Sequence, residues 1–194
     1  GLLDRQHSRF RRDIANISPS DGEWQRTYPP DGDMLAVIVR TADVRDLPGL
    51  LRIEEECFGI EMFSADTVRS FIERNDTFVM VAIEADDVVG SAMCMISEER
   101  QEGRIASVAV LPGSRRKGTG VRLLEECERK FLRFGLEMST LEVDVANGAA
   151  IALYESKGYE INGMIRDFYG LGRDAYVMQK PLHPEKTGIS IRTS

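Results

Sequence analysis

The chain has 194 residues, 42% of them hydrophobic and 29% charged, and a formal net charge of −7. This length suits one domain with a sizeable core, and the composition is ordinary for a soluble globular protein. No apolar run approaches the ~20 residues of a membrane span, and the acidic balance argues against nucleic acid as a partner. The first twelve residues lack the apolar run of a secretory signal, so we expect a cytoplasmic protein without membrane attachment.

The sequence has an odd number of cysteines, and they lie far apart within apolar patterns: Cys57, Cys94 and Cys127. We therefore expect three buried thiols in a reducing compartment and no disulfide framework. The sequence has no cluster with metal-ligand spacing, so no metal site is expected. The acidic surface suits a cationic substrate such as an amine, although solubility alone explains it equally well.

Breaker residues separate the N-terminal part from the rest of the chain. Residues 1–33 carry several arginines followed by Ser-Pro and Pro-Pro segments that cannot support long regular elements. We predict an N-terminal extension over 1–33 with a short helix near 6–17, one domain over 34–182, and a polar tail over 183–194. Three roles of the extension stay open: it covers a substrate cleft, pairs with another subunit in a homodimer, or forms an irregular tail.

Hydrophobic periodicity predicts a mixed α/β domain of about seven strands and four helices. The predicted strands are 34–40, 77–84, 88–97, 103–111, 141–145, 160–167 and 174–180. The predicted helices are 43–57, 64–74, 119–134 and 147–157. The first half is largely antiparallel, and the helix over 119–134 connects two strands that should pair in parallel, which differs from a doubly wound dinucleotide fold.

A basic, glycine-bearing turn connects a predicted strand to a predicted helix within Val108–Leu124. Such a turn leaves backbone N–H groups unpaired beside the positive end of a helix dipole, which favours phosphate. An ATP-binding P-loop is excluded, because Thr119 follows Gly118 where that motif needs lysine. Taken alone, the turn is either a phosphate site or only the entry to a helix.

Three segments in order give the sequence a family resemblance: Ile105–Leu124, Leu141–Tyr159 and Asp167–Met178. Together they resemble the GNAT superfamily of acetyl-CoA-dependent N-acetyltransferases, most closely the RimI-like and archaeal branch that acetylates protein N-termini. The resemblance covers about 34–182. It implies the acyl-CoA N-acyltransferase fold, acetyl-CoA as cosubstrate, and transfer of acetyl to an amine.

The resemblance also implies which residues bind acetyl-CoA. The pyrophosphate would be held by the turn formed by Arg115, Arg116, Lys117, Gly118, Thr119, Gly120 and Val121. The pantetheine arm would meet the backbone of Val108, Ala109 and Val110, where an N–H group would also stabilise the oxyanion of acyl transfer. Asn147 matches a further position that contacts CoA.

Glu142 and Tyr154 match the general base and the general acid of the RimI-like enzymes. The period of two along Leu141–Val145 places Glu142 on the face opposite the apolar side chains. From the residues alone, Glu142 is either that base or a solvated strand residue, and Tyr154 is either the acid or a core residue. Cys127 is expected to pack, consistent with direct transfer and no acyl-enzyme.

Two further segments match the substrate site of the family. Glu61 and Phe63 lie where the branch has a substrate-facing loop, and Glu61 is a candidate for a catalytic role or a surface carboxylate. Phe168 and Tyr169 match an aromatic pair that walls the peptide site.

The resemblance implies that the acceptors are protein or peptide N-termini, including those of ribosomal proteins. About a tenth of an α-amine is neutral at pH 7, against about 0.04% of a lysine amine, which favours the N-terminal acceptor. The alternatives are an acetyltransferase for small-molecule or lysine amines, and a non-catalytic module that binds acetyl-CoA.

Overall fold

The computed structural model of the protein describes residues 37–183. The predicted extension over 1–33 and nearly all of the predicted tail lie outside these residues, so neither prediction is tested.

Seven strands form one mixed sheet in the order β1-β2-β3-β4-β5-β7-β6. They are β1 (Ile38–Thr41), β2 (Thr77–Glu84), β3 (Asp87–Ser97), β4 (Glu102–Val110), β5 (Met138–Asp144), β6 (Glu160–Ile165) and β7 (Ala175–Pro181). Neighbours are antiparallel except β4 and β5, which pair in parallel as predicted. The predicted strand number and the parallel crossover are therefore confirmed.

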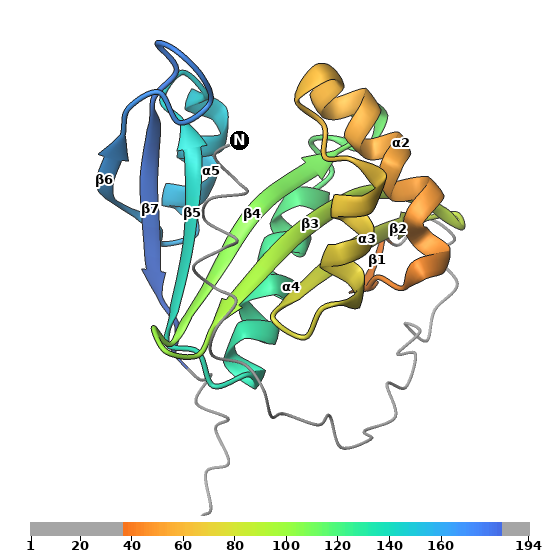
Figure 1. The fold of residues 1–194 in the computed structure, drawn as a ribbon, viewed down its shortest axis with the longest axis horizontal. Helices are drawn as coiled ribbons and strands as arrows, with labels where there is room; N and C mark the ends of the chain where they lie inside the picture. Colours follow the sequence, from red (N-terminus) through yellow and green to blue (C-terminus); the bar gives the residue numbers. More distant parts are fainter. Residues whose placement is uncertain (1–36, 184–194) are drawn as a thin grey trace, which may run out of the picture.

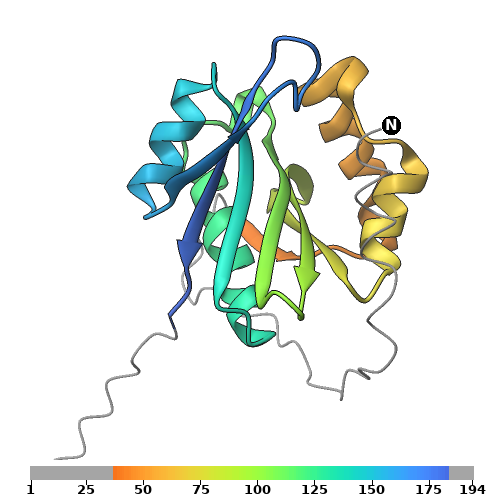
Figure 2. The same ribbon diagram turned by 60° about the vertical axis from the view of Figure 1, so that its left-hand side comes forward.

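Four α-helices cover the two faces of the sheet (Figures 1 and 2). They are α2 (Leu47–Phe58), α3 (Ala65–Glu73), α4 (Thr119–Arg133) and α5 (Gly148–Ser156). Helices α2 and α3 pack on one face of β2 and β3, and α4 and α5 pack against the apolar cluster on the opposite face. Short 3₁₀ turns occupy Val44–Asp46, Gly59–Glu61 and Pro112–Ser114.

Polar side chains begin the helices where the sequence predicts them. Asp43 caps the 3₁₀ turn before α2, Ser64 accepts a hydrogen bond from the N–H of Thr67, and Asn147 accepts one from the N–H of Ala150. Each cap satisfies a donor that the first helical turn leaves unpaired. The first predicted helix begins as a 3₁₀ turn, and the α-helix proper follows with Pro48 in its first turn, where no N–H is needed.

The core lies mainly between the sheet and α4, with a second apolar cluster under α2 and α3. Cys94 and Cys127 are buried in the first cluster, as predicted. Cys57 is only half-buried, so the prediction of three buried thiols is wrong for this residue. It lies in the last turn of α2, where its thiol donates to the carbonyl oxygen of Val110 at 3.6 Å.

The two parallel strands pair over only part of their length. Register pairs join Glu102–Ile105 to Met138–Leu141, and beyond them β4 and β5 diverge (Figure 1). At this point β4 carries a bulge, because its register with β3 shifts between Met93 and Cys94. A bulge increases local twist, which turns the strand away from its neighbour. We call the diverging residues, 106–110 of β4 and 142–144 of β5, the split.

A glycine allows the paired section of β4 to approach α4 closely. A Cβ atom added to Gly103 would lie 2.3 Å from ring atoms of Phe131. Phe131 is fully buried in the main cluster, so the ring has little room to move.

We predict that Gly103→Ala lowers the free energy of unfolding by about 1–3 kcal/mol, because the added methyl overpacks the core. Chemical denaturation measures the change. Gly163→Ala in β6 is the matched control: its Cβ would meet no atom within 4 Å, and its effect should stay within about 0.5 kcal/mol. Equal losses in both variants would contradict the close approach as the cause.

Candidate functional site

Glu142 is the first residue of β5 beyond the paired section. Leu141 and Val143 are buried in the main core, so Glu142 points to the opposite face, as the alternation predicts. Its side chain is only 13% exposed, which excludes the solvated alternative. Its Oε2 accepts a hydrogen bond from Nε of Arg104 at 2.9 Å, and Nη2 of the same guanidinium lies 2.8 Å from that oxygen.

Arg104 is a partner of Glu142 that no motif of the sequence predicts. Arg104 lies opposite Thr140 in the parallel register, so it shares a face with Thr140 and Glu142. On the same face, the Thr140 hydroxyl donates to Oε1 of Glu102 at 2.8 Å. Charged and polar residues alternate along both predicted strands. This alternation identifies Arg104 and Glu142 as neighbours only once the register between the two strands is known.

The segment between β6 and β7, residues 166–174, is attached to the carboxyl end of β5. The Tyr169 hydroxyl donates to the backbone carbonyl of Glu142 at 3.1 Å. Arg173 forms an ion pair with Asp144 at 3.0 Å and lies over the Tyr169 ring, 5.5 Å from its centroid. The ring of Phe168 contacts Tyr169 edge to face. These contacts place the predicted aromatic pair beside Glu142.

The Tyr169 hydroxyl stays protonated at neutral pH. Burial, followed by the negative charge of Glu142, raises the pKa of Tyr169 to about 12. Tyr169 is therefore a hydrogen-bond donor in this site, and its hydroxyl proton is used in the hydrogen bond to the Glu142 carbonyl.

Tyr154 approaches the split from the other face of the sheet. It lies on α5, packs against the main core, and its ring centroid is 5.9 Å from that of Tyr159. Burial raises the pKa of Tyr154 to about 12, so its hydroxyl keeps its proton at neutral pH. Tyr154 packs against the same apolar cluster as Val108 and Val110 of the diverging part of β4. Glu142 and Tyr154 thus flank the split from opposite faces.

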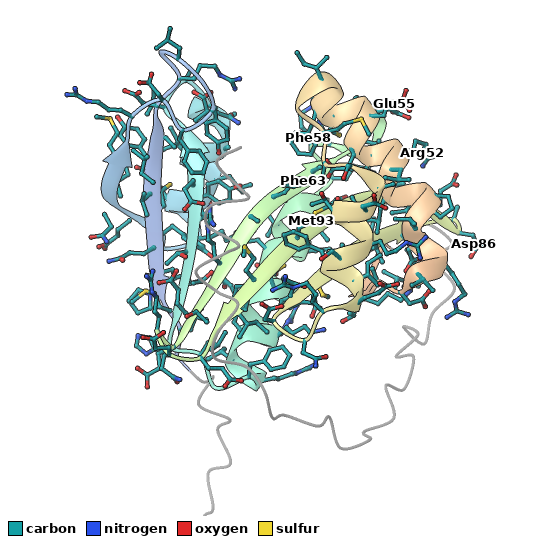
Figure 3. All side chains as sticks on the ribbon, viewed as in Figure 1. Arg52, Glu55, Phe58, Phe63, Asp86 and Met93 are labelled. Carbon is teal, nitrogen blue, oxygen red and sulfur yellow. The ribbon has the colours of Figure 1, made fainter. Side chains whose placement is uncertain are left out.

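The α2–α3 connection borders the face of the sheet that carries Glu142. The N–H of Phe63, which is labelled in Figure 3, donates to Oε2 of buried Glu54 at 2.9 Å. The Phe63 ring lies 6.1 Å from that of Phe71, centroid to centroid. Glu61 ends the 3₁₀ turn that precedes Phe63, so its backbone lies in this connection. The roles predicted for Glu61 and Phe63 stay predictions.

The predicted phosphate turn presents an unbroken row of backbone donors. Gly118 adopts φ +82 and Arg116 φ +60, the left-handed region that reverses the chain before α4. Within the described residues, the N–H groups of 116–121 have no hydrogen-bond acceptor. Six adjacent donors at a helix N-terminus are an arrangement that suits an anion, and the predicted contact with phosphate stays a prediction.

Two of the three basic side chains hold this turn in place. Lys117 forms an ion pair with Glu84 of β2 at 3.1 Å, and the Ser114 hydroxyl donates to the same carboxylate at 2.9 Å. These bonds lower the pKa of Glu84. Nε of Arg115 donates to the carbonyl oxygen of Val110 at 2.8 Å. Arg116 alone makes no such contact in the described part of the chain, so backbone groups supply most of the anion site.

Val108, Ala109 and Val110 pair with β3 on one side only. Their other edge faces the split, where no register pair with β5 forms. The Val110 carbonyl already accepts from Arg115 and Cys57. Val108 and Ala109 therefore form the part of this edge that is suited to an extended ligand that hydrogen-bonds like a strand. Ser107 lies next to it, and within the described residues its buried hydroxyl has no hydrogen-bond partner. The predicted contact of Asn147 with the cofactor stays a prediction, since its side-chain oxygen caps α5.

The sequence profile of the acetyltransferase (GNAT) family matches residues 47–159, more than half of the chain. The chain belongs to this family. It is 37% identical over 113 residues to an N-alpha-acetyltransferase from Saccharolobus solfataricus, a match that spans 53% of this chain and 68% of that protein. As a GNAT acetyltransferase, the protein has the fold predicted from its sequence.

Two solved structures share the fold of this acetyltransferase. The ribosomal-protein-S18-alanine N-acetyltransferase from Escherichia coli is 25% identical, with a TM-score of 0.68, covering 79% of this chain and 99% of that one. A chain of the NatC complex bound to Gag peptide and CoA is 22% identical, with a TM-score of 0.68, covering 76% of this chain and 99% of that one.

Residues 37–183 offer neither a metal site nor a membrane-spanning helix. No group of three His, Cys, Asp or Glu side chains in this part could hold a metal ion. None of the helices described here is both long and apolar enough to cross a membrane.

Burial of Glu54 predicts a dependence of stability on pH. Desolvation raises the pKa of Glu54 above its ordinary value of 4.5, despite the bond from Phe63. The folded state therefore binds the proton more tightly than the unfolded state, and stability falls as pH rises from the unfolded pKa through the folded one. Each unit of the pKa rise removes about 1.4 kcal/mol.

We expect the free energy of unfolding of wild type minus that of Glu54→Gln to fall between about pH 4 and about pH 8, because only wild type acquires the buried charge. Denaturant titrations at both pH values measure this difference. Glu55→Gln, an exposed neighbour on α2, is the control and should change stability by no more than about 0.5 kcal/mol at either pH. If the difference in free energy of unfolding between wild type and Glu54→Gln did not change with pH, the buried charge of Glu54 would not be its cause.

Proposed function

We propose that the protein transfers the acetyl group of acetyl-CoA to the N-terminal α-amine of a protein or peptide, in the cytoplasm. The observation that carries the proposal is the split, flanked by Glu142 on one face and Tyr154 on the other, with an anion site at its upper end. The family and the names of the relatives support the same chemistry.

The residues at the split fit acetyl-CoA. The N–H groups of 116–121 would bind the pyrophosphate, and the free edge of Val108–Val110 would pair with the pantetheine arm. A backbone N–H of the same edge would stabilise the oxyanion formed when the amine attacks the thioester carbon.

The proton transfers need a base and an acid. Glu142 would take a proton from the attacking amine, directly or through water, and Tyr154 would protonate the departing thiolate. With a pKa of about 12, Tyr154 holds its proton until the thiolate forms. The three cysteines are free thiols, which supports a reducing, cytoplasmic setting.

An N-terminal α-amine is the acceptor that this arrangement favours. A substantial fraction of an α-amine, about a tenth, is already neutral at pH 7, so one carboxylate is sufficient help. Phe63 on the α2–α3 connection and the Phe168–Tyr169 pair offer apolar walls for the residues that follow the amine. By analogy with the named relatives, ribosomal proteins are among the candidate acceptors.

The proposal is tested with acetyl-CoA and peptides that begin Ala, Ser, Met-Leu or Met-Glu, beside free polyamines and N-terminally blocked peptides with internal lysine. We expect CoA release only with free peptide N-termini, and mass spectrometry should place the acetyl group on the α-amine. Release with polyamines or lysine alone would reject the proposal. Acetyl-CoA binding by calorimetry without release on any acceptor would favour a binding module.

We predict that Tyr154→Phe lowers kcat by about 100-fold, the scale of a general acid, and leaves acetyl-CoA affinity nearly unchanged. Steady-state kinetics and calorimetry measure the two effects. Tyr159→Phe is the matched control: its hydroxyl shares a buried hydrogen bond with Ser139, so stability should fall by about 1 kcal/mol at an unchanged kcat. An unchanged kcat in Tyr154→Phe would remove Tyr154 as the acid.

A further inference from the structure

The two carboxylate oxygens of Glu142 have different surroundings. Arg104 directs both Nε and Nη2 at Oε2, at 2.9 and 2.8 Å. Within the described residues no hydrogen bond reaches Oε1. A guanidinium often binds a carboxylate through both oxygens, so the one-sided contact is a specific feature of this site.

Arg104 is held rigidly, and it restrains Glu142 in turn. It belongs to the paired section of β4, where the strand is bonded to β3 and to β5. The guanidinium and the carboxylate are each only 13% exposed, so water competes little for either group. The backbone of Glu142 is also fixed, because its carbonyl accepts the bond from Tyr169. Rotation of the carboxylate would break both contacts to Oε2.

We propose that Arg104 is a positioning residue that holds Glu142 by Oε2 and leaves Oε1 as the oxygen that accepts the proton of the attacking amine. This inference rests on the proposed function. As the new N–C bond forms and the C–S bond breaks, the amine proton passes to Oε1, directly or through one water. The thiolate leaves with a proton from Tyr154. Glu142 is then a neutral carboxyl group, and Arg104 still donates to its Oε2.

A double-mutant cycle tests whether Arg104 acts through Glu142. We expect Arg104→Met to lower kcat by about 10- to 100-fold, because small misplacements of a reacting group have effects of this size. We expect the same change made in Glu142→Gln to have no further effect, within about twofold. Arg104→Lys should recover only part of kcat, because an ammonium does not reproduce the two-donor contact. The KM for acetyl-CoA should stay within about twofold in all variants.

Two controls show that a loss of kcat is neither a folding defect nor a general effect of removing an arginine. Arg104→Met leaves an unpaired buried carboxylate, so each variant is checked by thermal unfolding. Glu142→Gln and Arg104→Met/Glu142→Gln both lack this carboxylate, and thermal unfolding also shows whether Glu142→Gln tolerates the Arg104 guanidinium without it. Arg129→Met, which breaks an exposed ion pair with Glu126 on α4, is the matched control with unchanged kcat.

The outcomes separate this inference from the proposed function. If Glu142→Gln keeps full turnover, the proposed role of the base fails. If Glu142→Gln loses turnover but Arg104→Met does not, or if the two losses multiply in the double variant, the positioning role alone is overturned.

Discussion

The loss of pairing between β4 and β5 is the constraint on which the rest of the site depends. Hydrogen bonds join the strands as far as Ile105 and Leu141, and the bulge in β4 then turns the two apart. An interior sheet edge left unpaired is unfavourable unless another partner satisfies it. Within the described residues, Val108 and Ala109 form no register pair on the side of β5, and this is the edge where the proposed function places an extended ligand.

Each side of the split has its own support. On the β4 side, Glu84 binds Ser114 and Lys117 and so fixes the anion-binding turn to β2. On the β5 side, Asp144 binds Arg173 and fixes the segment that carries Tyr169. Both ion pairs are partly exposed and contribute little to global stability. Their importance is local, because they orient two connections that the apolar core does not reach.

Much of this architecture was predictable because it depends on local patterns. The alternation of Leu141 and Val143 identified the inward face of β5, and capping residues such as Ser64 identified helix starts. Contacts between distant segments were not predictable. Arg104 meets Glu142 only through the register of two strands, and Cys57 is half-buried because α2 ends beside Val110. No sequence period encodes either contact.

The state of the cysteines supports direct attack of the amine. A thiol becomes a nucleophile when a base or a positive environment favours its thiolate. Burial instead raises the pKa of Cys94 far above its ordinary value, and Cys127 lies beside it in the core. Cys57 is half-buried at the end of α2, where its S–H donates to the Val110 carbonyl and Nη2 of Arg115 lies 3.9 Å from its sulfur. In the proposed reaction a carboxylate and a phenol move the protons, and the two buried thiols of the core take no part in it.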